Sequence, residues 1–242
     1  MRVVIGLICH MNPATLSADL SRLFAPGAIV ADLRVPGDPQ LLLPEEAACL
    51  GRAVPKRVGE FAAGRLCARR ALVEFGIVDF PIRVAADRQP IWPPSMVGSI
   101  THTAGFCAAV AAERQHADAL GLDCEVVGDV KPELWPRICA PAELEWVASL
   151  PAAEQAAAVT LIFAAKEAFY KCQYPLVSER LNFRDVSIES RAWGGSEGRF
   201  RIHAARRIAI CAHASHPWQG RFLFHDAWVT AGISMLCCRE IP

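Results

Sequence analysis

The sequence lacks an excess of charge of either sign, since its formal net charge is zero. Proteins that bind nucleic acid or acidic membrane surfaces usually carry a basic excess, so the neutral balance argues against both kinds of partner. Lysine is also scarce, with only four in 242 residues. Two of these four, Lys166 and Lys171, stand in one short segment and single that segment out.

The chain has no hydrophobic run long enough to cross a bilayer. Its longest apolar stretches, residues 97–112 and 156–165, are too short or too polar for the roughly 20 residues that a spanning helix needs. The first ten residues carry one charge and a short apolar run, with no small-residue cleavage site, so they favour a strand at residues 3–9 over a signal peptide. We therefore expect a cytoplasmic protein that does not enter a membrane.

The ten cysteines include no C-x-x-C pair and are scattered along the chain. A chain of this length does not need disulfides to fold, so we expect most of them to be small buried side chains in a reducing compartment. The hydrophobic fraction of 53% supports a substantial core, in one large domain or two smaller ones.

No short-period repeat is present, but strand-rich and helix-rich segments recur in both halves. This pattern predicts an α+β protein with two similar lobes that meet near residues 110–120. The expected helices are residues 15–24, a short one that begins at Pro44, 55–75 and 152–175. The expected strands are residues 28–33, 80–85, 106–112, 120–127, 181–189, 199–202, 222–229 and 231–238, while residues 209–220 remain an uninterpreted loop.

The segment from Ile162 to Pro175 is the most informative part of the chain. It follows an alanine-rich run and contains no Gly or Pro before its last residue, so it predicts a helix. Phe163, Glu167, Tyr170 and Lys171 share one face of that helix. The simplest interpretation is a surface ion pair between Glu167 and Lys171, which would stabilise the helix by about 0.2–0.5 kcal/mol.

An acidic pair precedes this helix in the chain, where Asp123 and Glu125 occupy alternate positions of an apolar segment. In a strand, their side chains point to the same side. Two half-buried carboxylates repel each other unless a cation lies between them, and an oxygen-seeking ion such as Mg²⁺ suits that position. The D-x-E pattern alone is short and common.

Two further segments could contact phosphate groups. The helix expected at residues 55–75 carries Arg57, Arg65 and Arg69 near one flank, and arginine binds phosphate through paired hydrogen bonds. The alternative is a solvated basic face. The segment Ser99-Ile100-Thr101-His102 lies between glycines and could form a phosphate-facing loop, although a lone histidine is more often structural.

Together these segments resemble the 4′-phosphopantetheinyl transferases, in the branch typified by enterobactin synthetase component D, the larger and monomeric class. The resemblance covers about residues 55–181 and rests on five motifs in order and register. The motifs are Lys56-Arg57-x-x-Glu60-Phe61-x-x-Gly64-Arg65-x-x-Ala68-Arg69, Pro90-x-Trp92-Pro93, Gly98-Ser99-Ile100-Thr101-His102, Gly121-Leu122-Asp123-Cys124-Glu125 and Phe163-Ala164-Ala165-Lys166-Glu167-Ala168-x-Tyr170-Lys171.

The resemblance implies a fold of two similar α+β lobes related by a pseudo-twofold axis, with residues 1–115 and 116–242 as the lobes. It also implies an enzyme that transfers the phosphopantetheine group of coenzyme A to a serine of an apo acyl or peptidyl carrier protein. The reaction would need Mg²⁺ and release adenosine 3′,5′-bisphosphate. Because the carrier supplies the nucleophile, the enzyme needs no reactive serine or cysteine of its own.

The resemblance also assigns roles to individual residues. It implies that Glu167, Lys171 and His102 are catalytic, with Glu167 as the general base for the incoming serine, either directly or through a water molecule that it orients. The implied metal ligands are Asp123, Glu125, Glu167 and the main-chain carbonyl of Cys124. The residues implied to contact coenzyme A are Arg57, Arg65, Arg88, Ser99, Thr101, His102, Asp123, Glu167, Lys171 and Leu181.

Two other functions use the same residues. A coenzyme A-binding protein without transfer activity would be expected to lack one of the acids or Lys171, and all are present. A Mg²⁺-dependent phosphohydrolase would cleave a nucleotide without any carrier. The sequence does not identify the carrier or its pathway, and we expect the carrier to dock near residues 172–180.

Overall fold

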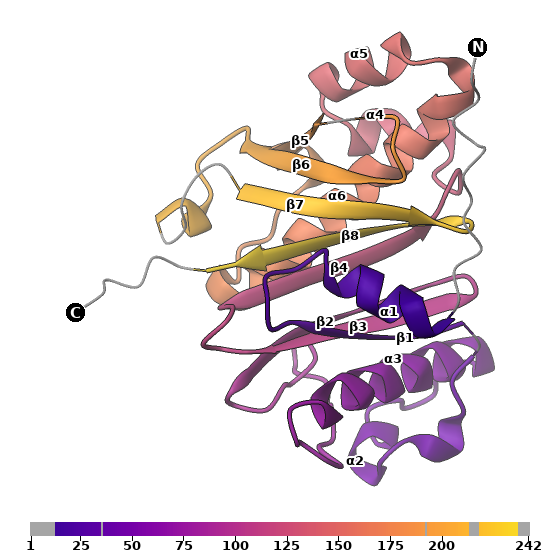
Figure 1. The fold of residues 1–242 in the computed structure, drawn as a ribbon, viewed down its shortest axis with the longest axis vertical. Coiled ribbons are helices and arrows are strands. Elements are labelled where there is room, and N and C mark those ends of the chain that lie inside the picture. Colours follow the sequence, from indigo (N-terminus) through magenta and orange to yellow (C-terminus); the bar gives the residue numbers. More distant parts are fainter. Residues whose placement is uncertain (1–12, 35, 192, 213–217, 237–242) are drawn as a thin grey trace.

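Two antiparallel sheets carry the fold, and each has a long helix packed against it (Figure 1). This computed structural model describes residues 13–34, 36–191, 193–212 and 218–236. The mixed arrangement confirms the α+β class expected from the sequence. The strand expected at residues 3–9 lies outside the described residues.

The first sheet has three strands in the order β1-β3-β2. They are β1 (Ile29–Leu33), β2 (Met96–Thr103) and β3 (Phe106–Glu113). The central strand β3 is apolar and buried along almost its whole length, because helices cover both of its faces. Helix α3 (Pro55–Val73) packs small side chains such as Ala68 and Ala71 on one face, and α1 (Pro13–Ser21) packs Leu16 and Leu20 on the other.

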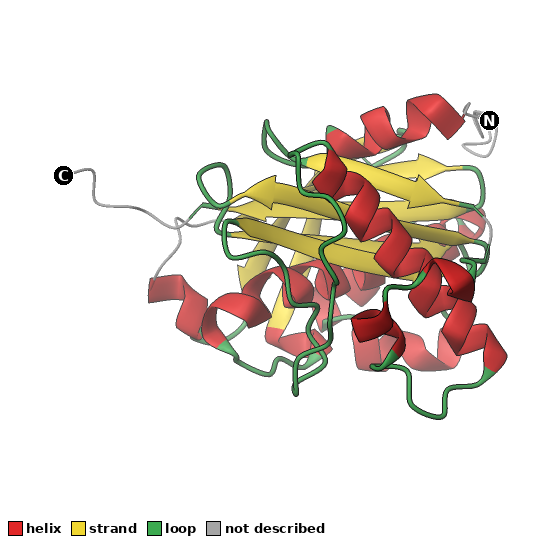
Figure 2. Ribbon diagram, turned by 90° about the horizontal axis from the view of Figure 1, so that it is seen from below, coloured by secondary structure: helices red, strands yellow, loops and turns green. Residues whose placement is uncertain are grey.

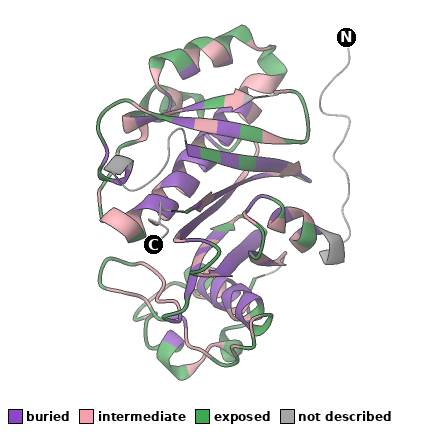
Figure 3. Cartoon of the chain, turned by 60° about the vertical axis from the view of Figure 1, so that its left-hand side comes forward, coloured by how far each residue is buried: buried purple, intermediate pink, exposed green. Residues whose placement is uncertain are grey.

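The second sheet has five strands in the order β4-β8-β7-β6-β5. They are β4 (Ala119–Val126), β5 (Val186–Arg191), β6 (Glu197–Ala204), β7 (Trp218–His225) and β8 (Trp228–Met235). Helix α6 (Ala152–Val177) buries its apolar side chains against this sheet, chiefly on β4 and β8. In Figure 2 the strands form one layer bordered by helices, and in Figure 3 the buried residues concentrate in the strands and the two long helices.

The two sheets meet where β2 lies beside β4. These strands belong to different sheets, and hydroxyl groups connect them. The Ser99 hydroxyl accepts a hydrogen bond from the Leu122 N–H (3.1 Å), and the Thr101 hydroxyl accepts one from the Cys124 N–H (3.0 Å). Side chains of one strand thus satisfy backbone groups of the next, as buried N–H groups require.

Several predicted elements differ from the structure. The Ser-Ile-Thr-His segment was expected as a loop but lies within β2. Residues 80–85 were expected as a strand, yet they form only one bridge, between Val84 and Pro90. Side chains satisfy the backbone of Ile82, where Glu46 accepts from the N–H and Arg65 donates to the carbonyl, both at 3.0 Å. The backbone groups of Arg83 and Ala85 bond within the local loop, to Pro81, Gln89, Arg88 and Ile91.

The boundaries of other elements also shift. Helix α6 continues past Pro175 to Val177 and ends where Ser178 takes a left-handed conformation with φ of 52°. The strand expected at residues 222–229 ends earlier, because Asp226 forms the turn between β7 and β8 with φ of 46°. The strand expected from Leu181 begins only at Val186, after the 3-10 turn η4 (Phe183–Asp185).

Some helices were not predicted from the sequence at all. These are α4 (Trp135–Ile138), α5 (Pro141–Ser149) and the 3-10 helices η2 (Pro39–Leu41), η3 (Pro132–Leu134) and η5 (Ala209–Ala212). The short helix α2 (Pro44–Ala47) begins at Pro44 as expected. The boundary expected between residues 115 and 116 lies in the connection from β3 to β4, and the division into two lobes stays a prediction.

Within the described ranges, no helix has both the length and the hydrophobicity that a membrane crossing requires. Of the six cysteines whose side chains are described, five are buried, as expected, and Cys49 is exposed. None of these six forms a disulfide.

Candidate active site

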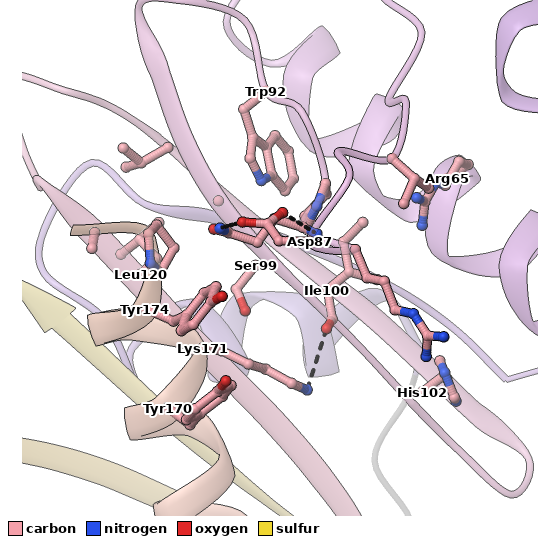
Figure 4. A pocket seen from close by; sticks show the side chains of 18 of the residues that line it. Arg65, Asp87, Trp92, Ser99, Ile100, His102, Leu120, Tyr170, Lys171 and Tyr174 are labelled. Atoms are coloured by element: carbon pink, nitrogen blue, oxygen red, sulfur yellow. Dashed lines mark hydrogen bonds between the residues drawn. The ribbon is translucent and has the colours of Figure 1, made fainter. Parts of the chain in front are cut away.

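A cleft of 980 Å³ lies between α3, β2 and α6 (Figure 4). Its wall contains seven of the site residues expected from the sequence: Arg57, Arg65, Arg88, Ser99, His102, Glu167 and Lys171. A second hollow of 770 Å³ contains Glu125 and Leu181. Glu167 and Tyr170 border both spaces, so the two hollows adjoin at this face of α6.

A glycine on β4 sets the position of α6. A Cβ atom on Gly121 would collide with the carbonyl oxygen of Ala168, so the helix backbone lies directly on the strand at this point. Glu167 and Lys171 flank Ala168 on α6, and the close contact brings them to the acidic end of β4. The G-L-D-C-E segment therefore supplies both the acids and the space for the helix that approaches them.

The Asp123 carboxylate is buried and has two hydrogen-bond donors on one oxygen. Lys171 Nζ donates to Oδ1 over 2.7 Å, and the Thr101 hydroxyl donates to the same atom over 3.2 Å. Oδ2 is buried and has no hydrogen-bond partner among the described residues. Burial raises the pKa of Asp123, and the charge of Lys171 opposes that rise.

The three carboxylates expected to bind metal are electrostatic neighbours. Burial, together with the charges of Asp123 and Glu167, raises the pKa of Glu125 to about 8. Burial and the charge of Asp123 likewise raise the pKa of Glu167. Repulsion between such half-buried carboxylates is relieved when a cation lies between them.

The ammonium group of Lys171, 48 residues further along the chain, lies at the acidic cluster. Lys171 reaches Asp123 and also donates to the carbonyls of Ile100 (3.4 Å) and Leu122 (3.2 Å). Its ammonium group therefore bridges β2 and β4 at the acidic cluster. The expected pair between Glu167 and Lys171 is replaced by the pair between Asp123 and Lys171.

The donor set fits a hard divalent cation. Asp123 Oδ2 lacks a partner, and Glu125 and Glu167 add further oxygens, which are the ligands that Mg²⁺ prefers. As the side chains stand, no three His, Cys, Asp or Glu groups within the described parts of the chain are gathered closely enough to form a ligand shell. The thiol of Cys124 is buried beside Thr230, and burial raises its pKa, so the sulfur is not a ligand in this arrangement.

The arginines lie on the opposite wall of the cleft. Arg57 Nη1 is 2.7 Å from His102 Nε2, and burial together with the charge of Arg57 lowers the pKa of His102. The histidine is therefore neutral and accepts the hydrogen bond from Arg57. Arg65 is buried, stacks at 3.8 Å over the Phe61 ring, and keeps its charge at neutral pH although burial lowers its pKa to about 10.

Thr101 and Leu181 lie apart from this cleft. Thr101 is only 1% exposed, and its hydroxyl faces β4 rather than the cleft. Leu181 lines the second hollow with Phe163 and Tyr170. Arg88 lines the cleft from a turn in which its φ is 73°.

The sequence interpretation missed two contributors to the site. Tyr174 lines the cleft and stacks on Tyr170 with ring centroids 5.3 Å apart, a pairing that their spacing of four residues on a helix could have indicated. Glu46 is fully buried and holds both Arg69 and the Ile82 N–H, so it fixes the segment that binds Arg65. No local sequence signal marks that role, because its partners are distant in the chain.

Two family models match the chain, one in each half. Residues 45–112 match the 4′-phosphopantetheinyl transferase N-terminal domain, and residues 119–230 match the 4′-phosphopantetheinyl transferase superfamily.

Three relatives illustrate the similarity. The 4′-phosphopantetheinyl transferase PptT of Mycobacterium tuberculosis is 38% identical over 198 residues, which cover 78% of this chain and 81% of PptT. The 4′-phosphopantetheinyl transferase Svp of Streptomyces mobaraensis is 41% identical over 155 residues, 63% of each chain. Enterobactin synthase component D of Escherichia coli is 39% identical over 124 residues, 50% of this chain and 57% of that protein. The chain therefore belongs to the 4′-phosphopantetheinyl transferase superfamily of enzymes.

Proposed function

We propose that this enzyme transfers the 4′-phosphopantetheine group of coenzyme A to a serine of an apo acyl or peptidyl carrier protein and requires Mg²⁺ to do so. The observation that carries the proposal is the position of Glu167. It borders an arginine-lined cleft on one side and a mostly apolar hollow on the other, and Lys171 and Asp123 pair beside it. Such a place suits a reaction in which a phosphate-rich donor meets a second substrate.

In the proposed reaction the serine oxygen of the carrier bonds to the phosphorus that carries pantetheine. The bond from that phosphorus to the bridging pyrophosphate oxygen breaks, and adenosine 3′,5′-bisphosphate leaves. Glu167 accepts the serine proton, which needs a basic carboxylate at this position. Mg²⁺ held by Asp123, Glu125 and Glu167 would neutralise charge that develops on the phosphoryl oxygens.

The chain's cations bind and orient the donor. Arg57 and Arg65 would hold phosphate groups of coenzyme A, since arginine offers several N–H donors in one plane. Because His102 accepts a hydrogen bond from Arg57 at Nε2, its own proton lies on Nδ1, which is 4.0 Å from a carboxylate oxygen of Glu60. His102 would donate this proton to a phosphate group of coenzyme A. Lys171 would turn from Asp123 to the pyrophosphate and stabilise the leaving group.

We propose that the carrier docks beside the end of α6. Within the expected segment, Cys172 and Gln173 are fully buried, whereas Tyr174, Pro175, Leu176 and Arg180 line the cleft. The contact would therefore involve only the residues from Tyr174 onward. The monomeric state is a proposal that rests on the sequence resemblance, and the two-lobed division is one that rests on the resemblance and on the recurrence of strand-rich and helix-rich segments. The cytoplasmic location is a proposal that rests on the composition of the chain.

The decisive experiment is intact-mass spectrometry of a purified apo carrier protein incubated with the enzyme, coenzyme A and Mg²⁺. We expect the carrier to gain the mass of one phosphopantetheine group and expect a chelator to prevent the gain. Unmodified carriers, with coenzyme A still bound in calorimetry, would indicate a binding protein instead. Cleavage of coenzyme A in the absence of a carrier would indicate a phosphohydrolase.

A further inference from the structure

Thr101 connects the two sheets at the point where the acidic cluster begins. It lies on β2, and its hydroxyl makes two hydrogen bonds to neighbouring residues of β4. The hydroxyl accepts from the Cys124 N–H at 3.0 Å and donates to Asp123 Oδ1 at 3.2 Å. Its side chain is almost completely buried, so it cannot act by direct contact with a substrate in the cleft.

The two hydrogen bonds fix the direction of the hydroxyl proton. A threonine hydroxyl has one proton to donate and two lone pairs to accept with. The Cys124 N–H occupies the acceptor side, which leaves the proton for Asp123. The β-branched side chain also restricts rotation about χ1. Thr101 therefore holds one oxygen of the Asp123 carboxylate from a rigid position on the neighbouring strand.

Because Thr101 holds Oδ1, the other oxygen of Asp123, Oδ2, is the one available to a ligand. Oδ1 receives hydrogen bonds from both Thr101 and Lys171, whereas Oδ2 is buried and unpartnered within the described part of the chain. A buried carboxylate oxygen without a partner is costly. A ligand that removes this cost must be a donor or a cation, and the neighbouring carboxylates Glu125 and Glu167 favour a cation.

We propose that Thr101 is a positioning residue, whose hydroxyl holds Asp123 Oδ1 so that Oδ2 is left to ligate the divalent cation. This inference rests on the proposed function in one respect, since both assume that the site binds a divalent cation. It gives Thr101 a different role from the nucleotide contact expected from the sequence. Outer hydrogen bonds of this kind commonly orient metal ligands and change metal affinity by about 10- to 100-fold.

Ser99 provides a matched comparison. Its hydroxyl also connects β2 to β4, through the Leu122 N–H at 3.1 Å, and no hydrogen bond joins it to Asp123 in the described structure. If Thr101 mattered only as a connection between the sheets, the loss of either hydroxyl would have a similar effect on metal binding. If Thr101 orients Asp123, only its own hydroxyl matters.

The test is the affinity for Mn²⁺ alone, measured without coenzyme A by electron paramagnetic resonance of the free and bound ion. We expect Thr101→Val to weaken Mn²⁺ binding about 10-fold or more. Thr101→Ser keeps the hydroxyl and should restore binding to within about twofold of the unaltered enzyme, and Ser99→Ala should stay within about twofold as well. Thermal unfolding identifies folded variants, and Thr101→Ala replaces Thr101→Val if the latter does not fold.

Three results would overturn the inference: unchanged Mn²⁺ binding in Thr101→Val, an equal loss in Ser99→Ala, or no rescue by serine. The carrier assay separates this outcome from the fate of the proposed function. If the enzyme modifies the carrier but binds Mn²⁺ equally well with and without the Thr101 hydroxyl, the proposed function stands and the role of Thr101 is refuted. If the Mn²⁺ affinity depends on Thr101 but no carrier is modified, the role of Thr101 stands and the proposed function is refuted.

Discussion

Gly121 on β4 lies so close to the Ala168 carbonyl on α6 that a methyl group between them would collide with the helix backbone. The same contact places Cys172 Cβ within 2.8 Å of the missing Cβ position. Helix backbone cannot move aside as a flexible side chain can. The register of α6 over β4, and with it the approach of Lys171 to Asp123, therefore depends on this glycine.

We predict that Gly121→Ala destabilises the protein by about 1–3 kcal/mol, as overpacking of a well-filled core does, and lowers transfer activity because α6 must shift. Chemical denaturation and the carrier assay measure the two effects. Gly59→Ala in α3 is the matched control. A Cβ there would meet only Pro36 and Gly37 at 3.6 Å or more, and alanine favours the helix by up to about 1 kcal/mol. A Gly121→Ala enzyme as stable as Gly59→Ala would contradict the packing argument.

Glu167→Gln is predicted to abolish transfer and to leave coenzyme A binding largely intact. The amide keeps the shape of the side chain but cannot accept the serine proton and is a poorer metal ligand. Intact-mass assays of the carrier and calorimetry with coenzyme A measure the two properties. Glu145→Gln, the same change at an exposed position of α5, should retain full activity. Transfer at an undiminished rate by Glu167→Gln would remove this residue from the mechanism.

Part of the site could be predicted from the sequence, because it depends on spacing within one element. Asp123 and Glu125 share a side of β4 through strand alternation, and Glu167 and Lys171 share a face of α6 through helical periodicity. Their proximity to one another follows from tertiary packing at Gly121. The motif contains this glycine, but its spacing does not reveal the partner.

Other parts could not be predicted, because their partners are far apart in the chain. Thr101 on one sheet contacts Asp123 on the other, whereas the sequence predicts a phosphate-facing loop for its segment. Residues 80–85 have strand-like composition, yet at Ile82 the side chains of Glu46 and Arg65 take the hydrogen bonds that a neighbouring strand would have made. Local propensity does not determine which distant side chain satisfies a backbone group.

Lys166 precedes Glu167 in the motif but has a structural role. Its ammonium is buried and donates to Glu143 (2.7 Å) and to the carbonyls of Ile138 and Phe183 (both 2.9 Å). Glu143 in turn accepts from the Ile188 N–H. These contacts join α4, α5, η4 and β5 to α6.

We predict that Lys166→Met lowers the free energy of unfolding by about 3–5 kcal/mol, because it leaves the buried Glu143 without its cation. Urea denaturation measures the loss. Lys56→Met is the control, since Lys56 is 85% exposed and its nitrogen is 3.9 Å from Glu60, so little change is expected. A loss no greater than that of the control would show that the buried pair contributes nothing.

His225 should make stability depend on pH. The ring is buried against Phe106 and Trp228, and its Nε2 is 2.7 Å from the Thr230 hydroxyl. Burial lowers the pKa of His225 to about 4 from its ordinary value of 6.5. The folded protein therefore keeps this histidine neutral at a pH where the unfolded chain has already bound a proton.

Because the pKa is lowered on folding, this contribution is intact above pH 6.5, where the histidine is neutral in both states. It is lost as pH falls from 6.5 towards 4, and the total loss is about 3 kcal/mol. We predict that His225→Gln removes this part of the pH dependence, as measured by urea denaturation at several values between pH 7 and 4.5. Carboxylates also contribute to acid unfolding, so the difference between the two proteins is the test. His203→Gln, at an exposed histidine beside Glu189, should keep the slope of the unaltered enzyme. If His225→Gln keeps it too, burial of His225 does not control the acid sensitivity of the fold.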